Sequence, residues 1–179
     1  MKYRKQQRLS NFDYSPPGAY FVTICVSDMQ CKLGDVVGGQ MVLNEAGEHV
    51  KTCLLDLPHH YSNCDLDEFV VMPNHFHGIV RIVGNGLKPF PTQHGLPEIV
   101  RGLKTFSSRR INASKSGNPF QWQKSFYDRV VRNENELHLI REYIVNNPMS
   151  WELDKNNQDI NGNHLFVGNS RDCSLQERG

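Results

Sequence analysis

Apolar and polar residues follow two different spacings along the chain. Short runs rich in β-branched and aromatic residues are typical of strands, and they predict strands at residues 19–26, 68–72, 75–83 and 125–131, with a glycine-rich, hairpin-like segment at 34–39. Apolar residues three and four positions apart are typical of amphipathic helices, and they predict helices at residues 44–57, 97–111 and 133–147. Strands and helices are therefore intermixed along the chain.

Residues that begin and end helices support two of these assignments. Asn44 is a suitable N-cap for the first helix, and Pro58 is expected to stop it. Asn133 is a suitable N-cap for the last helix, because Glu136 follows it at the spacing of a capping box. Pro148 is expected to end that helix, since proline cannot continue the pattern of backbone hydrogen bonds.

The order of the elements predicts the fold class. The strands at 68–72 and 75–83 are joined by Pro73 and Asn74, which suit a tight turn because proline presets φ and asparagine tolerates the left-handed conformation. Neighbouring strands with short connections favour an antiparallel sheet, and amphipathic helices must bury their apolar faces against it. We therefore predict an α+β fold in which helices pack on one face of an antiparallel sheet.

The composition fits one folded domain between two polar ends. Of the 179 residues, 38% are hydrophobic and 22% charged. We expect a basic arm at residues 1–18, the folded domain at 19–153 and a loosely held polar tail at 154–179. No apolar run approaches the ~20 residues that cross a membrane. The five cysteines include no Cys-x-x-Cys pair, which favours a reducing cytoplasm over a disulfide scaffold.

Positive charge is concentrated in one part of the chain. The formal net charge is only +1, yet residues 101–132 carry eight basic side chains and one acidic side chain. Such a local surplus suits a surface that binds a polyanion. A solvated helix face explains a run of charges equally well, so the charge alone does not establish a nucleic-acid partner.

Two histidines in the third predicted strand are candidate metal ligands. His75 and His77 are two positions apart, so their side chains point to the same face of the strand and can converge on one cation. Phe76 points to the other face, which its apolar neighbours identify as the core. The histidines are therefore expected on the more accessible face. Isolated His-x-His pairs also occur by chance.

The last predicted helix carries a candidate nucleophile. Tyr143 and Asn147 are four residues apart and therefore lie on one face of the helix. A phenol is a poor nucleophile at neutral pH unless a nearby cation polarises the electrophile. The alternative is structural, with Tyr143 packing against Leu139 and Asn147 capping the helix end. Tyr127 is a second candidate tyrosine, on a strand, where packing is the simpler role.

Several stretches of the sequence resemble one family. The run VMPNHFHGIV at 71–80 is similar to the HUH motif (histidine, hydrophobic residue, histidine) of single-tyrosine transposases that act on single-stranded DNA. Over residues 8–153 the chain resembles the branch called REP-associated tyrosine transposases, through further similar stretches at 21–23, 102–104, 122–129 and 141–151. The combination of Met-Pro-Asn-His-x-His with a later Tyr-x-x-x-Asn-Pro carries the resemblance, because each half alone is unspecific.

The resemblance implies a fold and a set of site residues. The fold would be the ferredoxin-like HUH fold with a C-terminal tyrosine helix. His75, His77 and Asn147 would hold Mg²⁺ or Mn²⁺, and Tyr143 would be the catalytic tyrosine. Imidazoles are softer ligands than these ions prefer, so water and a phosphate oxygen would complete the coordination.

The resemblance also implies an activity and a partner. The protein would be a metal-dependent endonuclease and strand transferase that acts on single-stranded DNA at hairpin-associated sites through a 5′-phosphotyrosine, without a nucleotide cofactor. Basic residues would contact the DNA, namely Arg8, Arg101, Lys104, Arg109 and Arg110. A monomer is compatible with the sequence, and so is a homodimer in which one chain's tyrosine helix completes the other's site.

Two alternatives remain open at this point. The first is a domesticated DNA-hairpin-binding protein of the same fold that no longer cuts. Retention of both the histidine pair and Tyr143 argues against it, because binding alone would not need them. The second is a zinc hydrolase that uses His75 and His77, which would require a third ligand and a general-base carboxylate such as Glu142 or Asp128.

Overall fold

The computed structural model describes residues 16–83, 94–113, 118–154 and 156–157. Most of the predicted basic arm and polar tail therefore lie outside the described residues, as does Arg8.

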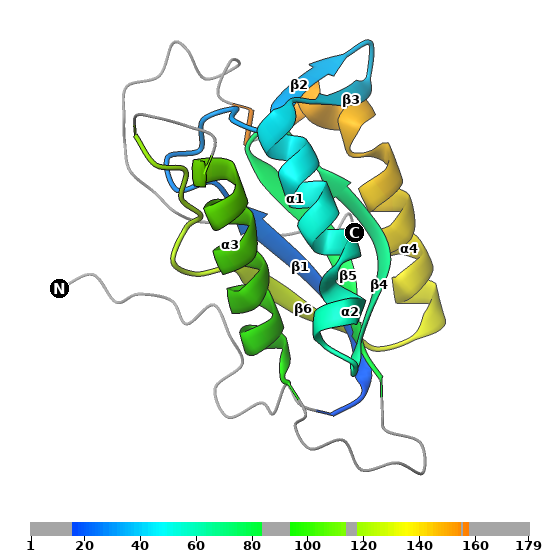
Figure 1. The fold of residues 1–179 in the computed structure, drawn as a ribbon. Helices are drawn as coiled ribbons and strands as arrows, with labels where there is room; N and C mark the ends of the chain where they lie inside the picture. The colour runs from blue at the N-terminus through cyan, green and yellow to red at the C-terminus, as the bar shows by residue number, and fades with distance from the viewer. Residues whose placement is uncertain (1–15, 84–93, 114–117, 155, 158–179) are drawn as a thin grey trace, which may run out of the picture.

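An antiparallel sheet forms the centre of the molecule (Figure 1). Its strands lie in the order β4 (Cys64–Val71), β5 (His75–Ile82), β1 (Gly18–Cys25) and β6 (Tyr127–Val131). Each neighbouring pair is antiparallel, and in the central pair Cys25 lies opposite His75. A separate hairpin is formed by β2 (Gly34–Val37) and β3 (Gln40–Leu43). The predicted antiparallel sheet and the α+β class are confirmed.

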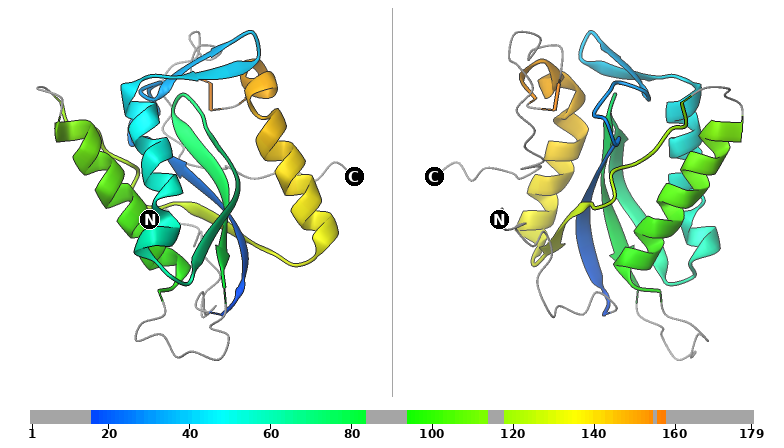
Figure 2. Two further views of the ribbon diagram at one scale, coloured as in Figure 1. Left: turned by 45° about the vertical axis from the view of Figure 1, so that its right-hand side comes forward. Right: turned by 90° about the vertical axis from the view of Figure 1, so that its left-hand side faces the viewer.

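The helices are divided between the two faces of this sheet. One face is covered by α1 (Glu45–Leu55), α2 (Leu57–His60) and α3 (Leu96–Ala113), and the other by α4 (Glu134–Asn146), which continues into the 3-10 helix η1 (Pro148–Leu153) (Figure 2). The expectation that the helices share one face therefore holds for α1 to α3 and not for α4. Among the described residues, no helix has both the length and the apolar character needed to cross a membrane.

Strand β1 explains why both faces are covered. Its alternating side chains are mostly apolar on both sides, so neither face can be left in water. Tyr20, Val22 and Ile24 belong to the larger apolar cluster, which includes residues of α1 and α3. Phe21 belongs to a second, smaller cluster with Ile79 of β5 and with the apolar face of α4. This second cluster positions the helix that carries the candidate nucleophile.

The expected helix boundaries are largely confirmed. The Asn44 side chain accepts a hydrogen bond from the Gly47 backbone N–H at 3.1 Å, and the Asn133 side chain accepts one from the Glu136 N–H at 2.9 Å. The expectation for Pro58 is wrong in detail, because α1 ends before it, at Leu55, and Pro58 lies in the first turn of α2. Proline is tolerated there since the first backbone N–H groups of a helix have no intrahelical partner.

Candidate active site

Strand β5 presents two histidines beneath α4. The His75 and His77 Nε2 atoms lie 2.9 Å apart, while Phe76 points into the core on the other face, as predicted. The expectation that the histidine face is accessible is wrong, since both side chains are buried. The reason is that α4 and η1 cover this face: the Tyr143 ring lies 5.3 Å from His77 and the Trp151 ring 5.9 Å from His75, between ring centroids.

The second nitrogen of each imidazole also has a partner. His75 Nδ1 lies 2.8 Å from Asn74 Oδ1, and His77 Nδ1 lies 2.7 Å from Thr23 Oγ1. Burial lowers the pKa of His75 to about 3, because desolvation disfavours the charged imidazolium. His75 is therefore neutral across the physiological range. A neutral imidazole held by one nitrogen presents the lone pair of the other nitrogen to a cation.

The hydroxyl of Tyr143 reaches the histidine pair from the same chain. Its oxygen lies 3.3 Å from His77 Nε2. Phe21 stacks on the His77 ring at 5.5 Å and meets the Tyr143 ring edge-on at 6.0 Å, so both rings rest on one aromatic residue. The alternative in which Tyr143 packs against Leu139 does not describe this site, because Leu139 is 63% exposed. A partner subunit is not needed to deliver this hydroxyl.

Asn147 caps the end of α4 and also has a buried side-chain oxygen. Its backbone is the C-cap of α4, with its N–H donating to the Ile144 carbonyl at 3.3 Å. Its side chain, however, is only 3% exposed, and its Oδ1 atom has no hydrogen-bond partner among the described residues. It lies midway in the chain between Tyr143 and Trp151, whose rings both contact the histidine pair. A buried amide oxygen without a partner is costly, so this atom is suited to receive a ligand.

Two ion pairs hold α4 in place over the sheet. The Arg141 guanidinium donates two hydrogen bonds to the Asp67 carboxylate of β4, at 2.7 and 2.6 Å. Glu136, in the first turn of α4, pairs with Arg129 of β6 at 2.7 Å. The helix is thereby fixed to both edge strands of the sheet, which sets the position of the Tyr143 hydroxyl.

The rival tyrosine has the packing role expected for it. Tyr127 begins β6, where it lies opposite Thr23 of β1. Its ring meets Phe21 edge-on, with centroids 6.4 Å apart, and it packs against the apolar cluster beneath α4. Of the two candidates, Tyr143 is the one whose hydroxyl lies at the histidine pair, 3.3 Å from His77 Nε2. It is located one helical turn before Asn147.

The predicted DNA-binding residues of α3 lie on the opposite face of the sheet. Lys104 donates to the backbone carbonyls of Gln123 and Ser125 at 3.0 and 2.9 Å, so it holds the segment that leads into β6. Arg101 pairs with Glu98 on its own helix at 3.5 Å. These contacts give both residues a structural role. The structure therefore separates the basic helix from the histidine pair.

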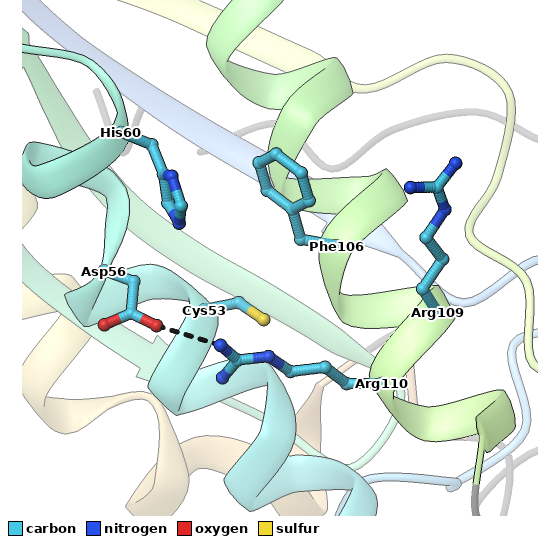
Figure 3. A pocket seen from close by; sticks show the side chains of 6 residues that line it. All are labelled: Cys53, Asp56, His60, Phe106, Arg109 and Arg110. Carbon is cyan, nitrogen blue, oxygen red and sulfur yellow. Dashed lines mark hydrogen bonds and ion pairs between the residues drawn. The ribbon is translucent and has the colours of Figure 1, made fainter.

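The remaining two arginines of α3 line a pocket between α1 and α3. The pocket has a volume of about 220 Å³, and Figure 3 shows Arg110 directed at Asp56, with which it pairs at 3.2 Å, while Arg109 points away. The rings of His60 and Phe106 face each other here, 5.0 Å apart between centroids. Arg109 makes no ion pair with any residue that the structure describes, so its charge is available to a polyanion.

The zinc-hydrolase alternative finds no support in the geometry. It requires a third ligand from histidine, cysteine or a carboxylate beside His75 and His77. Within the described ranges, no group of three or more such side chains is placed to hold a metal ion. The two imidazole nitrogens are the candidate donors that the structure brings together, and the buried Oδ1 of Asn147 remains a further candidate.

Sequence reasoning missed the residues that support the histidines and α4. The predicted turn at Pro73 and Asn74 is present, with the Met72 N–H donating to the His75 carbonyl at 2.8 Å, but Asn74 is not left-handed, since Met29 is the one non-glycine residue with positive φ among those described. Asn74 acts through its side chain instead. Thr23 and Arg141 lie in stretches that resemble the family, but nothing in the sequence indicated their roles or that of Asp67, since they contact residues that are far apart in sequence.

Comparisons with known proteins identify a matching family, a similar sequence and a similar fold. The family described as "Transposase IS200 like" matches residues 40–147, which include both histidines, Tyr143 and Asn147. An uncharacterized protein of Haemophilus influenzae is 34% identical over 168 residues, covering 86% of this chain and 92% of that protein. A solved structure described as a REP-associated tyrosine transposase bound to a REP hairpin is 17% identical, covers 99% of this chain and 98% of its own, and superimposes with a TM-score of 0.58.

Proposed function

Because the chain belongs to the IS200-like transposase family, we propose that it cuts and rejoins single-stranded DNA with Tyr143 as the nucleophile. The observation that carries this proposal is the position of the Tyr143 hydroxyl, 3.3 Å from Nε2 of His77. A tyrosine with a purely structural role has no need of a buried imidazole pair at its hydroxyl. The arrangement instead combines a nucleophile with a potential cation site.

The side chains at the site fit Mg²⁺ or Mn²⁺. His75 and His77 would hold the ion through Nε2, and Asn147 would hold it through the Oδ1 atom that lacks a partner among the described residues. An imidazole nitrogen and an amide oxygen ligate a cation as neutral donors, so the ion would keep its positive charge for the substrate. When bound, it would neutralise charge on the scissile phosphate.

The protein's own residues supply the remaining parts of the reaction. The Tyr143 oxygen attacks phosphorus, the bond from phosphorus to the 3′ oxygen breaks, and the phenolic proton ends on that 3′ oxygen. The products are a 5′-phosphotyrosine and a free 3′-hydroxyl. A second 3′-hydroxyl reverses the step, so rejoining needs no nucleotide cofactor. Phe21 supports the ring of Tyr143 and the ring of His77 together, which keeps nucleophile and ligand in register.

A hairpin with single-stranded flanks is the substrate that we propose. The solved transposase with a similar fold is described as bound to a REP hairpin, and Arg109, which makes no ion pair with the described residues, offers a contact for a phosphate backbone. Arg8, Arg101, Lys104 and Arg110 remain further candidates for backbone contacts. The hydroxyl and the histidines come from one chain, so we propose that the monomer is competent and that a homodimer is not required.

A covalent-adduct assay tests this proposal. The full chain is incubated with hairpin DNA carrying 3′ and 5′ single-stranded flanks and with Mg²⁺ or Mn²⁺, and an SDS-resistant protein–DNA adduct is measured. Wild type and Tyr127→Phe should form the adduct, whereas Tyr143→Phe should bind the DNA without forming it. A chelator should stop adduct formation.

Two outcomes would contradict the proposal. Adduct that persists in Tyr143→Phe and disappears in Tyr127→Phe would identify the other tyrosine as the nucleophile. Tight hairpin binding by wild type, with no adduct under any divalent cation, would favour the DNA-binding protein that does not cut.

A further inference from the structure

The amide of Asn74 is buried and fully hydrogen-bonded. Asn74 precedes β5, and its Nδ2 donates to the backbone carbonyls of Met29 at 2.8 Å and Asn156 at 2.7 Å. Its Oδ1 lies 2.8 Å from His75 Nδ1. Backbone carbonyls can only accept hydrogen bonds, so both N–H groups of the amide point at them. The side chain therefore has one orientation, with its oxygen towards His75.

This orientation determines which nitrogen of His75 carries the proton. An amide oxygen can only accept, so His75 must donate from Nδ1 and leave the lone pair on Nε2. The partner of His77 Nδ1, the Thr23 hydroxyl, does not restrict the proton to one nitrogen of its imidazole. The Thr23 hydroxyl, 2.7 Å from His77 Nδ1, can either donate or accept, so it is compatible with both neutral tautomers of that ring. Of these two contacts, only the one from Asn74 selects a single tautomer of the histidine that it holds.

Asn74 also ties His75 to the chain that follows α4. Its partner Asn156 lies 82 positions further along the sequence. The same segment includes Trp151, whose ring lies 5.9 Å from His75, and Asn157, whose Nδ2 donates to the Trp151 carbonyl at 3.1 Å. One side chain thus joins the start of β5, the histidine pair and the covering segment.

We propose that Asn74 is a positioning residue that prepares His75 as a cation ligand, by fixing the proton on Nδ1 and the ring against the segment after η1. The inference rests on the proposed cation site at His75 and His77. Partners of this kind behind ligating histidines typically change metal affinity about 10–100-fold when removed.

The first measurement uses wild-type protein and needs no metal. Two-bond ¹H–¹⁵N NMR correlations of the imidazoles, assigned with His75→Gln, report which nitrogen is protonated. We expect the Nδ1–H tautomer for His75 in wild type, and its loss or mixing in Asn74→Ala. A wild-type His75 ring protonated on Nε2 would overturn the inference.

The second measurement is the affinity for Mn²⁺ alone, by electron paramagnetic resonance. Asn74→Ala should bind about 10–100-fold more weakly than wild type. Asn74→Asp lacks the donors to Met29 and Asn156 but keeps an acceptor for His75, so it should lose less affinity than Asn74→Ala does. Asn112→Ala removes another asparagine that donates to a backbone carbonyl, on α3 across the sheet from the histidines, and should bind as wild type does.

The outcomes separate this inference from the proposed function. If wild type binds Mn²⁺ and Asn74→Ala binds it equally well, the inference fails and the cation site stands. If Asn74→Asp loses as much affinity as Asn74→Ala, with similar losses of thermal stability, Asn74 is only structural. If wild type binds no Mn²⁺, the cation part of the proposed function fails as well.

Discussion

Replacing Ile144 tests whether α4 packs on the sheet of its own chain. Ile144 is 0% exposed in the second apolar cluster, and the next residue of the helix, Val145, is 61% exposed. Ile144→Ala removes three carbon groups, or about 2.4 kcal/mol at about 0.8 kcal/mol each. The cavity left behind raises the expected loss in the free energy of unfolding to about 3–4 kcal/mol.

Urea unfolding followed by fluorescence measures this loss. Val145→Ala is the matched control, because it truncates the neighbouring residue of the same helix on the exposed side and should change stability by no more than about 0.5 kcal/mol. Ile144→Val removes a single methylene and should cost about 0.5–1.5 kcal/mol. The expected loss in the free energy of unfolding is therefore largest for Ile144→Ala, smaller for Ile144→Val and smallest for Val145→Ala.

Two results would refute the reasoning. Equal losses for Ile144→Ala and Val145→Ala would mean that α4 does not bury this face, and Tyr143 would then not be held at His77. A wild-type unfolding midpoint that rises with protein concentration would show that α4 packs on another copy of the chain. The structure, in which α4 contacts its own sheet, predicts a midpoint independent of concentration.

Two further predictions concern the charged residues. The hydrogen bonds from the Arg141 guanidinium hold the pKa of Asp67 below its ordinary value of 3.8, because they outweigh the opposing effect of partial burial. The Asp67 carboxylate therefore stabilises the fold above pH 3.8, and this stabilisation is lost as the pH falls through the lowered pKa. Asp67→Asn should therefore lower the melting temperature at pH 7 and by much less at the acid end of the titration, and a loss independent of pH would contradict this. Arg109→Ala should weaken hairpin binding and reduce the slope of log affinity against log salt by about 0.7–0.9, whereas Lys51→Ala on α1 should leave both unchanged; equal effects would remove Arg109 from the interface.

The elements of the fold could be predicted because their signals are local. Asn44, Asn133 and Pro148 act within one turn of the helices that they delimit, so short sequence windows contain the evidence. The face on which each helix lies is not a local property. Strand β1 is apolar on both sides, and the sequence alone gave no measure of how much surface each side had to bury.

The candidate site shows the same division. The spacing of His75 and His77 put them on one face of a strand, and the spacing of Tyr143 and Asn147 put them on one face of a helix. The contact between these two faces joins residues that are far apart in sequence. Before the structure, only the resemblance to a family indicated it. The burial of the histidines could not be foreseen, because it comes from α4 and η1, whose packing depends on contacts such as Arg141 with Asp67.

The separation of α3 from the histidine pair constrains how DNA can engage this protein. Tyr143 belongs to α4, which covers one face of the sheet, while Arg109 belongs to α3, which covers the other face beside α1 (Figure 2). A nucleic acid that contacts both residues has to pass around the sheet, at the edge strands β4 or β6 or past the ends of the strands, since the sheet and its core separate the two faces. Charge contacts on α3 would then set affinity and salt dependence, whereas the buried site would set the rate of adduct formation. A substitution at Arg109 should consequently leave the adduct rate at saturating DNA unchanged, even where it weakens binding.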